Sequence, residues 1–487
     1  MWADLNHTKG KFFWYANWTL LLFNFGSTWW VWNASSFGAV AAILLNALFT
    51  TLIYLAARFT RLQLSSKHGY IALLVYWVAW EYVHHDWDLS WPWLTLGYAF
   101  AERPEWVQWY SYTGSFGGSI WVLGANVLAF RVLKYWSSET KHRLVSGQAI
   151  SLLLWIVVPL ITSLIQYSNY QDLGEDMEVV LVQPNIDPYN EKFGGMTSLD
   201  QVRKILDLAE DQITPNTKFV VAPETAVPDA LSEDKLEGSQ EYQLLEEFAQ
   251  KHPQISIVIG ATTYHFFSED EPIPLTARTA NGGAKYEVYN TALLVRKDSI
   301  PEFYHKSKLV PGVEMMPFPG FFMHFQDLAF NLGGTTGSLG RQKVRDVFYH
   351  QDGTVVAPVV CYESIYGEFV GDYVKNGAEA IFIITNDGWW GDTPGYKQHL
   401  AYARLRAVEQ RRSVARSANT GISATINQRG DVIAQSQWWE PAVIRDTIKV
   451  NKEQTPYAKN GDVIARTSLL FSGLLLLMAV GRKLKER

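Results

Sequence analysis

Six long apolar segments, five of them in the first third of the chain and one near its C-terminus, constrain this sequence more than any other feature. A helix crosses the hydrocarbon core of a bilayer with about 17 to 25 mostly apolar residues. Tyr70–Val83 is shorter and contains Glu81, so we interpret it as a tilted span. Buried helices of a large soluble core are the alternative, which the Trp and Tyr residues at the segment edges disfavour. The segments are Phe12–Trp32, Phe37–Ala57, Tyr70–Val83, Phe116–Leu133, Ile150–Ile165 and Thr467–Val480.

The tryptophans show that the chain joins two unlike parts. Of its 20 Trp residues, 16 lie at or before Trp155. The overall content of 48% hydrophobic and 18% charged residues is therefore an average over both parts. We predict a transmembrane helical domain of about five spans at 1–168, an α/β domain at 169–465, and a last transmembrane helix with a basic tail at 466–487.

Basic residues alternate with non-basic loops between the predicted spans. Lys and Arg collect in the short cytoplasmic loops of membrane proteins. The loop after the third segment is acidic and aromatic instead, with Asp86, Asp88, Glu102 and Glu105 against Arg103. This alternation predicts that both termini lie in the cytoplasm and that 169–465 lies outside it. The basic residues are Lys9, Lys11, Arg58, Arg61, Lys67, Arg131, Lys134, Lys141, Arg143, Arg482, Lys483, Lys485 and Arg487.

Short β-rich runs alternate with helical stretches in the segment 169–465. Apolar runs of four to eight residues bounded by turn residues are typical of buried strands. The expected strands are Glu178–Val182, Lys218–Ala222, Ile255–Ile259, Thr291–Val295, Val355–Val360 and Ala380–Ile384. The expected helices are Leu199–Gln212, Glu241–Lys251 and Gln398–Arg412. The pattern predicts an α/β domain.

Composition excludes several classes of function. A net charge of -6 supplies no general basic field, so we exclude nucleic acid as a partner. The single cysteine, Cys361, excludes a disulfide within the chain and a cysteine-based zinc cluster. His84-His85-Asp86 has no second cluster at ligand spacing, so we interpret it as helix-cap or interfacial polar residues. We expect no metal and no cofactor.

Three residues are candidates for catalysis, although each of them alone could equally be a structural or solvent-exposed residue. Cys361 ends the apolar run Thr354–Val360, where a strand presents a side chain at the rim of a sheet, but a lone cysteine is more often a small core residue. Glu224 follows Lys218–Ala222 and is either an exposed loop residue or a general base. Lys306 lies in a polar loop, where a lysine is usually solvated.

Together these residues resemble a known arrangement. Pro223-Glu224-Thr225, Lys306 before Leu309-Val310-Pro311, and Cys361-Tyr362-Glu363 resemble the Glu-Lys-Cys triad of the nitrilase superfamily. With membrane spans on both sides, the chain is similar over almost its whole length to the membrane-embedded apolipoprotein N-acyltransferases of that superfamily. Further matching residues are Val182-Gln183-Pro184-Asn185-Ile186, Tyr289-Asn290-Thr291, Thr385-Asn386-Asp387-Gly388-Trp389-Trp390-Gly391, Gln398-His399, Arg404, Arg406, Glu409 and Arg416-Asn419-Thr420-Gly421.

The resemblance implies a fold, a reaction and a location. The fold is a nitrilase-like α-β-β-α sandwich outside the cytoplasm, attached to a multi-span helical domain in the bacterial inner membrane. The reaction moves an acyl chain from a phospholipid to Cys361 as a thioester, and then to the α-amino group of a diacylglyceryl-cysteine apolipoprotein, the last step of lipoprotein maturation. Glu224 is the expected base, and Lys306 stabilises the oxyanion together with a backbone N–H near Tyr362. Glu314 and Glu363 are expected to orient Lys306 or tune proton transfer, and Tyr362 to line the site.

The sequence also departs from the family pattern. Family members usually have about eight spans, whereas six are counted here, and the chain opens inside what corresponds to the third. An even number of missing helices keeps the predicted side of the catalytic domain. The loop Val313–Pro317 retains the acidic Glu314 in less familiar surroundings.

The sequence is also compatible with two other functions. A membrane-tethered amidase of the nitrilase type would use the same triad on a small C–N substrate, but it needs at most one anchor. A membrane scaffold with an inactive hydrolase domain would not need all three triad residues. Trp389, Trp390 and Trp91-Pro92-Trp93 are expected to hold acyl chains or to lie in the headgroup layer, and simple interfacial anchoring explains them equally well.

Overall fold

The computed structural model describes residues 2–136, 142–318 and 338–486 and forms two compact units. Unit 1 comprises residues 1–170 and 460–487, and unit 2 comprises residues 171–459. Lys141 and Arg487, two of the basic residues that flank the predicted spans, lie outside the described residues. The assignment of the chain to a membrane domain, a catalytic domain and a basic tail stays a prediction.

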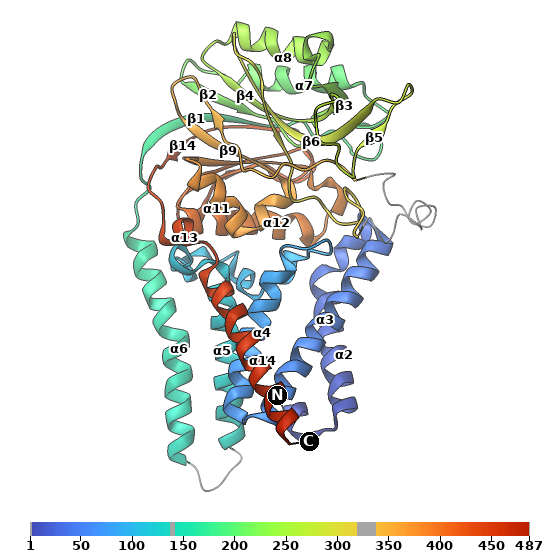
Figure 1. The fold of residues 1–487 in the computed structure, drawn as a ribbon. Helices are drawn as coiled ribbons and strands as arrows, with labels where there is room; N and C mark the ends of the chain where they lie inside the picture. Colours follow the sequence, from blue (N-terminus) through green and yellow to red (C-terminus); the bar gives the residue numbers. More distant parts are fainter. Residues whose placement is uncertain (1, 137–141, 319–337, 487) are drawn as a thin grey trace. The chain divides into compact units, whose positions relative to one another are not determined.

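Unit 1 is helical (Figure 1). Serine caps begin two of its helices: the hydroxyl of Ser35 accepts from the N–H of Gly38, and that of Ser65 from the N–H of His68. Such caps satisfy N–H groups that have no partner within the helix. The helices are α1 (Trp2–Asn6), α2 (Lys9–Thr28), α3 (Ser36–Gln63), α4 (Ser66–His84), α5 (Tyr110–Trp136), α6 (His142–Asn169) and α14 (Val463–Lys485).

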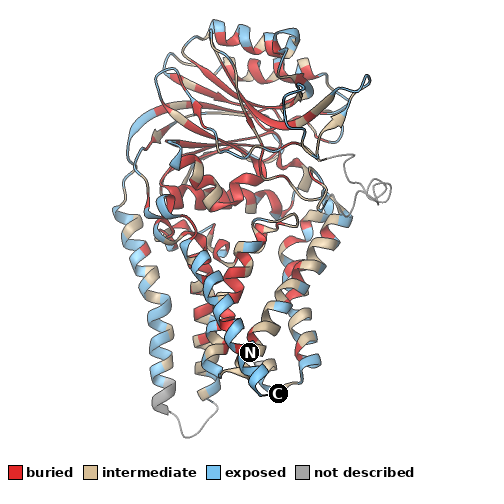
Figure 2. Ribbon diagram, in the orientation of Figure 1, coloured by how far each residue is buried: buried red, intermediate tan, exposed pale blue. Residues whose placement is uncertain are grey.

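Four helices among the described residues are long and apolar enough to cross a membrane: Ser36–Gln63, Tyr110–Trp136, Ser146–Asn169 and Val463–Lys485. Figure 2 shows α6 and α14 exposed along much of their length. Such exposed apolar helices fit a lipid environment better than water. Helices α2 and α4 also form where spans were predicted, but they do not meet this criterion, so a count of six spans stays a prediction.

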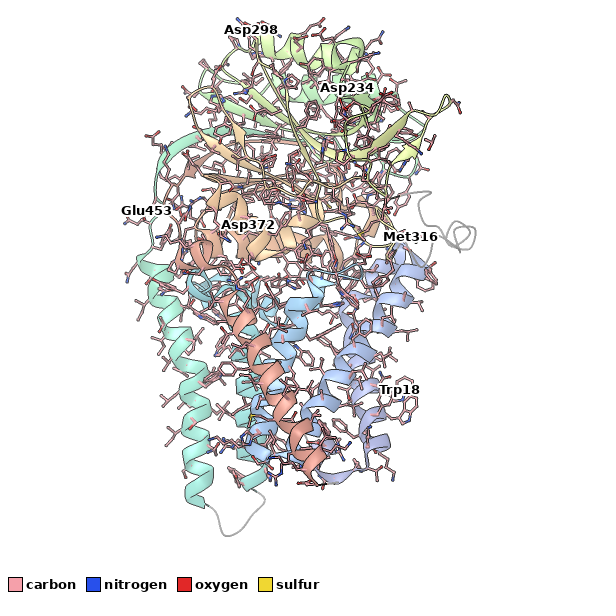
Figure 3. All side chains as sticks on the ribbon, viewed as in Figure 1. Trp18, Asp234, Asp298, Met316, Asp372 and Glu453 are labelled. Atoms are coloured by element: carbon pink, nitrogen blue, oxygen red, sulfur yellow. The ribbon has the colours of Figure 1, made fainter. Side chains whose placement is uncertain are left out.

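Aromatic side chains connect and surround the helices of unit 1. The indole N–H of Trp121 donates to the carbonyl oxygen of Trp155 at 2.7 Å, and the indole of Trp155 donates to the carbonyl of Trp121 at 2.9 Å. This reciprocal pair joins α5 to α6. Trp18 instead projects outward from α2 and is 57% exposed (Figure 3).

Unit 2 contains two β-sheets. Within the described residues, the first sheet has eight strands in the order β14-β1-β2-β4-β6-β5, with β3 beside β4 and β7 beside β6. The second has six, in the order β13-β12-β11-β10-β9-β8. The first sheet comprises β1 (Glu175–Gln183), β2 (Thr217–Val221), β3 (Val227–Ser232), β4 (Ser256–Phe266), β5 (Arg278–Thr279), β6 (Lys285–Arg296), β7 (Glu302–His305) and β14 (Ala442–Val450). The second comprises β8 (Phe348–Tyr349), β9 (Val355–Val360), β10 (Ala380–Thr385), β11 (Val414–Ala418), β12 (Ala424–Ile426) and β13 (Val432–Gln435).

Helices cover the outer faces of both sheets, which gives four layers in the order α-β-β-α (Figure 1). Val221 of the first sheet and Phe382 of the second belong to one buried cluster between the sheets. On the outer face of the first sheet, Val220 packs with Ile205 and Leu245 of the covering helices. The fold class expected from the sequence is therefore confirmed. The covering helices are α7 (Ser198–Glu210), α8 (Gln240–Lys251), α11 (Gly367–Lys375) and α12 (Pro394–Gln410).

The expected strands and helices of this unit all form, with ends that differ by a few residues. The largest differences are in β4 and β6, which extend to Phe266 and begin at Lys285, because they pair with each other as a long antiparallel ladder from Ser256↔Arg296 to Phe266↔Tyr286. Such pairing between distant segments cannot be read from local periodicity. The length of β6 is relevant to the site because this strand carries Asn290.

Candidate active site

The predicted triad residues each follow the end of a strand. Glu224 comes three residues after β2, Lys306 directly follows β7, and Cys361 directly follows β9. The ammonium nitrogen of Lys306 lies 2.9 Å from Oε1 of Glu224. The charges of Glu224 and Lys306 both act on the thiol of Cys361. The structure thus brings the three residues together within unit 2.

Glu314 and Asn290 complete this cluster. Oε1 of Glu314 also lies 2.9 Å from Nζ of Lys306, so the lysine is shared by two carboxylates. The amide nitrogen of Asn290 donates to Glu224 at 2.8 Å and to Glu314 at 2.9 Å. These bonds to Glu224 use Oε1, and among the described residues Oε2 has no hydrogen-bond donor. Oε2 of Glu224 is therefore left as an acceptor without a donor among the described residues.

Burial and charge set the protonation of this cluster. Burial alone would lower the pKa of Lys306, but Glu224 and Glu314 outweigh it and raise that pKa well above its usual value. Burial alone would raise the pKa of Glu224, but Lys306, Asn290 and the nearby Lys192 together hold it below its usual value. Lys306 is therefore an ammonium ion and Glu224 a carboxylate near neutral pH.

Cys361 is held as an un-ionised thiol. Burial raises the pKa of the thiol, the charge of Glu224 raises it further, and Lys306 lowers it only in part. A thiolate is the reactive form of cysteine, so a base must remove the proton during attack. Glu224 is an ionised carboxylate whose charge acts on this thiol.

The backbone at Cys361 has an unusual conformation. Its φ angle is 49°, in the left-handed region that side chains other than glycine rarely adopt. Its carbonyl oxygen accepts from the hydroxyl of Ser364 at 2.7 Å and from Nε2 of His399 at 3.1 Å. Backbone strain of this kind costs about 1–3 kcal/mol and persists only where the surroundings hold it. These two bonds hold the turn that presents the sulfur.

A buried charged network lies behind this turn. Oδ1 of Asp387 lies 3.0 Å from Nδ1 of His399, and Oδ2 accepts from Nη2 of Arg416 at 2.6 Å. Burial alone would raise the pKa of Asp387, but Arg416 and then His399 lower it well below its usual value. Asp387 therefore stays ionised and keeps His399 aimed at the Cys361 carbonyl.

Glu363 was expected to orient Lys306 or to tune proton transfer. It is fully buried, and its carboxylate accepts from the backbone N–H groups of Ser307 at 2.6 Å and Val360 at 2.9 Å. These residues adjoin Lys306 and Cys361 in the chain. Glu363 thus acts on the backbone that carries both residues, while Tyr362 is buried next to Cys361, with its ring 5.4 Å from that of Tyr366.

Gly260 of β4 supports the turn that carries Glu224. Its N–H donates to the carbonyl of Pro223 at 3.0 Å. A Cβ atom at position 260 would lie 2.5 Å from Cα of Glu224 and 2.5 Å from the backbone nitrogen of Thr225. Only glycine allows the strand and the turn to approach this closely.

The predicted tryptophans have different surroundings. Trp389 contacts the exposed rings of Tyr189 and Phe193, with centroid distances of 5.4 and 6.3 Å. Trp93 is buried against Trp30 at 4.8 Å, which does not fit a role in the headgroup layer.

No group of three or more potential metal ligands occurs among the described residues. In the His84-His85-Asp86 segment, Nδ1 of His84 accepts from the indole N–H of Trp87 at 2.7 Å. Nε2 of His84 contacts the side-chain oxygen of Asn46 at 2.5 Å. Both ring nitrogens of His84 are therefore occupied by protein groups.

Two family models match the chain. The carbon-nitrogen hydrolase model matches residues 179–456, and the model of the apolipoprotein N-acyltransferase N-terminal domain matches residues 1–128. The chain belongs to the carbon-nitrogen hydrolase family.

The chain is also similar in sequence to proteins named apolipoprotein N-acyltransferase. The chain is 29% identical to the apolipoprotein N-acyltransferase of Chlorobaculum tepidum, over 99% of this chain and 90% of that protein. It is 26% identical to the enzyme of the same name from Shewanella oneidensis, over 98% of this chain and 89% of that protein. The resemblance seen in the sequence is therefore confirmed. Together with the four long apolar helices found among the described residues, it identifies the chain as a membrane protein.

Two solved structures of other proteins are also similar to this chain. A crystal structure of Saccharomyces cerevisiae Nit3, a nitrilase superfamily member, matches with a TM-score of 0.39 and 17% identity, over 57% of this chain and 92% of that one. An amidase from Nesterenkonia sp. matches with a TM-score of 0.40 and 15% identity, over 61% of this chain and 97% of that one.

Proposed function

We propose that this chain transfers an acyl chain from a phospholipid to the α-amino group of a diacylglyceryl-cysteine apolipoprotein, through a thioester on Cys361. The observation that carries the proposal is the buried ion pair of Glu224 and Lys306, 2.9 Å apart, whose charges act on the only cysteine of the chain. The names of the relatives support this reaction class. The long apolar helices favour a lipid substrate over the small C–N substrate of a tethered amidase. We also propose that the protein lies in the bacterial inner membrane with unit 2 on the periplasmic side.

In the first half-reaction, Glu224 accepts the thiol proton as the sulfur of Cys361 attacks the ester carbonyl. The new C–S bond places negative charge on the carbonyl oxygen, and the Lys306 ammonium stabilises that charge. Collapse of this intermediate breaks the C–O bond to the glycerol oxygen. Glu224 returns the proton to this oxygen, so the lysophospholipid leaves as an alcohol and the acyl chain stays on sulfur.

In the second half-reaction, the uncharged α-amino group of the apolipoprotein attacks the thioester carbonyl. Glu224 accepts a proton from the attacking nitrogen, and Lys306 again stabilises the oxyanion. Collapse breaks the C–S bond, and the sulfur recovers the proton from Glu224. The products are an N-acylated lipoprotein and the starting thiol.

The test is an assay of the purified protein with a phospholipid and a diacylated lipopeptide, with products identified by mass. The proposal predicts a lipopeptide heavier by one acyl chain, and a lysophospholipid in equal amount. Turnover of small amides without acyl transfer would favour the amidase alternative. No turnover of either substrate would contradict both.

A further inference from the structure

Lys192 is a buried cation that the triad does not include. It lies in the loop between β1 and α7, and its side chain is 2% exposed. Its ammonium nitrogen donates to the carbonyl oxygen of Glu224 at 3.1 Å and to the hydroxyl of Thr225 at 2.6 Å. Both bonds therefore end on the turn that carries the proposed base.

The bond to Thr225 falls at a strained position. Thr225 has a φ angle of 47°, and left-handed backbone is particularly unfavourable for a β-branched residue. Such a conformation needs partners that hold it. The Lys192 ammonium holds it from the loop side, and Gly260 of β4 supports the same turn through Pro223.

Among the described residues, the Lys192 ammonium forms no ion pair with a carboxylate. In the part of the chain that the structure describes, no carboxylate oxygen lies within ion-pair distance of its ammonium nitrogen. Burial lowers the pKa of Lys192 to about 8, and the charges of Glu224 and Cys361 partly oppose that shift. A buried charge is unfavourable unless other charges compensate it. The compensating charge here belongs to the active site.

Lys192 compensates an excess of negative charge in the site. Glu224 is faced by Lys306 from the end of β7, by Glu314 from the following loop, by Cys361 from the end of β9, and by Lys192. Asp387, which also acts on Cys361, is paired with Arg416. Two carboxylates that share one lysine leave a formal charge of -1 in this cluster, and Lys192 brings the sum to zero.

We propose that Lys192 is a positioning residue for acyl transfer, which fixes the Glu224 turn and balances the charge of the buried carboxylates so that Glu224 is ionised when the thiol must lose its proton. This inference rests on the proposed function for its biological meaning. The effect of Lys192 is on the ionisation of Glu224 and the reactivity of Cys361, and neither property involves a lipid. It can therefore be tested without either lipid substrate.

The test is the rate of Cys361 alkylation by iodoacetamide as a function of pH, followed by the mass of the intact full-length protein. Cys361 is the only cysteine, so the mass change reports this thiol alone. The variants are Lys192→Met, Lys192→Gln, which keeps a donor for Thr225 without the charge, and Lys192→Arg, which keeps the charge. Lys235→Met, at an exposed lysine of unit 2, is the matched control.

In the unmodified protein we expect the rate to fall only in acid, where Glu224 becomes protonated. In both Lys192→Met and Lys192→Gln we expect this acidic limb, the pH range over which the rate falls, to move to higher pH by on the order of one unit. At the former midpoint the rate should then fall roughly fivefold. Lys192→Arg and Lys235→Met should leave the limb in place. A purely structural role would slow alkylation without moving the limb.

An acidic limb at the same pH in Lys192→Gln as in the unmodified protein would overturn the inference. Thermal unfolding of each variant identifies any that fails to fold, and Lys192→Gln tests the charge if Lys192→Met fails. If the unmodified protein does not transfer acyl chains while the limb moves as expected, the proposed function fails and the role of Lys192 stands.

Discussion

The carboxylate of Glu363 accepts a hydrogen bond at 2.6 Å from the backbone N–H of Ser307, the residue directly after Lys306. Its other oxygen accepts at 2.9 Å from Val360, the residue directly before Cys361. One buried carboxylate thus fixes the strand ends that carry the proposed oxyanion-stabilising cation and the proposed nucleophile. The spacing of these two groups depends on it.

Glu363→Gln tests this connection. A carboxylate offers only acceptors here, whereas the amide nitrogen of glutamine would meet a backbone N–H. We expect a loss of about 1–3 kcal/mol in the free energy of unfolding, because a buried donor loses its partner. A misplacement of about 1 Å between reacting groups also predicts a fall of roughly 100-fold in acyl-enzyme formation.

Thermal unfolding and the rate of labelled acyl-enzyme formation measure these two effects. Glu246→Gln, at an exposed glutamate on α8, is the control and should change neither. Unchanged rates of acyl-enzyme formation in Glu363→Gln would show that Glu363 does not set the geometry of the site.

Gly260→Ala should displace the proposed base. The added Cβ would lie 2.5 Å from backbone atoms of Glu224 and Thr225. Backbone atoms cannot move aside as the end of a flexible side chain could. We expect roughly 100-fold slower acyl-enzyme formation. Gly238→Ala meets nothing within 4 Å and should react at the original rate. Equal rates for the two variants would contradict the proposed role of the Glu224 turn.

The pH dependence of acyl-enzyme formation should follow Glu224 and not a free thiol. Because the pKa of Glu224 is lowered, the base stays ionised down to a pH below the usual glutamate value of about 4.3. Because burial raises the pKa of Cys361, no thiolate forms without the base between pH 7 and 9. We expect a rate that is flat over this range and falls only in acid. A rate that rises through about pH 8.5, as for an unperturbed thiol, would rule out this coupling.

The Asp387–Arg416 ion pair should contribute strongly to stability. Both side chains are fully buried, and removal of one partner from such a pair typically costs about 3–5 kcal/mol. Asp387 has a lowered pKa, so its contribution is present above the unfolded value of about 3.9 and is lost as the pH falls toward the folded value.

Denaturant unfolding of Asp387→Asn at neutral pH measures this contribution. Asp176→Asn, which removes an exposed partner of Lys449, should cost less than about 1 kcal/mol. Equal losses in the two variants would show that the buried network does not hold the nucleophile turn more firmly than a surface pair.

The sequence predicts those site residues that directly follow an apolar strand. Glu224 and Cys361 follow apolar runs that form β2 and β9, and their position in the chain already places them at a sheet edge. Glu314 was expected beside Lys306, and it lies there. The catalytic roles of these residues stay proposals.

Other residues of the site depend on contacts between distant segments. Lys192 lies 32 positions from Glu224, and nothing in its local sequence separates it from a solvated loop lysine. Asn290 did carry a signal: asparagine is unfavourable inside a strand, and it lies in the middle of β6. Its two bonds to Glu224 and Glu314 explain its presence there. Asp387, His399 and Arg416 matched the family pattern, but only the fold shows that they hold the Cys361 turn.

The most direct test of the central claim is the capture of an acyl-enzyme from a phospholipid with a labelled acyl chain. The protein is quenched in acid and its intact mass is measured before and after hydroxylamine, which cleaves thioesters. We predict one labelled acyl chain per protein molecule, released by hydroxylamine, and none in Cys361→Ala or in Glu224→Gln. A labelled acyl chain retained by the Cys361→Ala protein would contradict the assignment of the nucleophile.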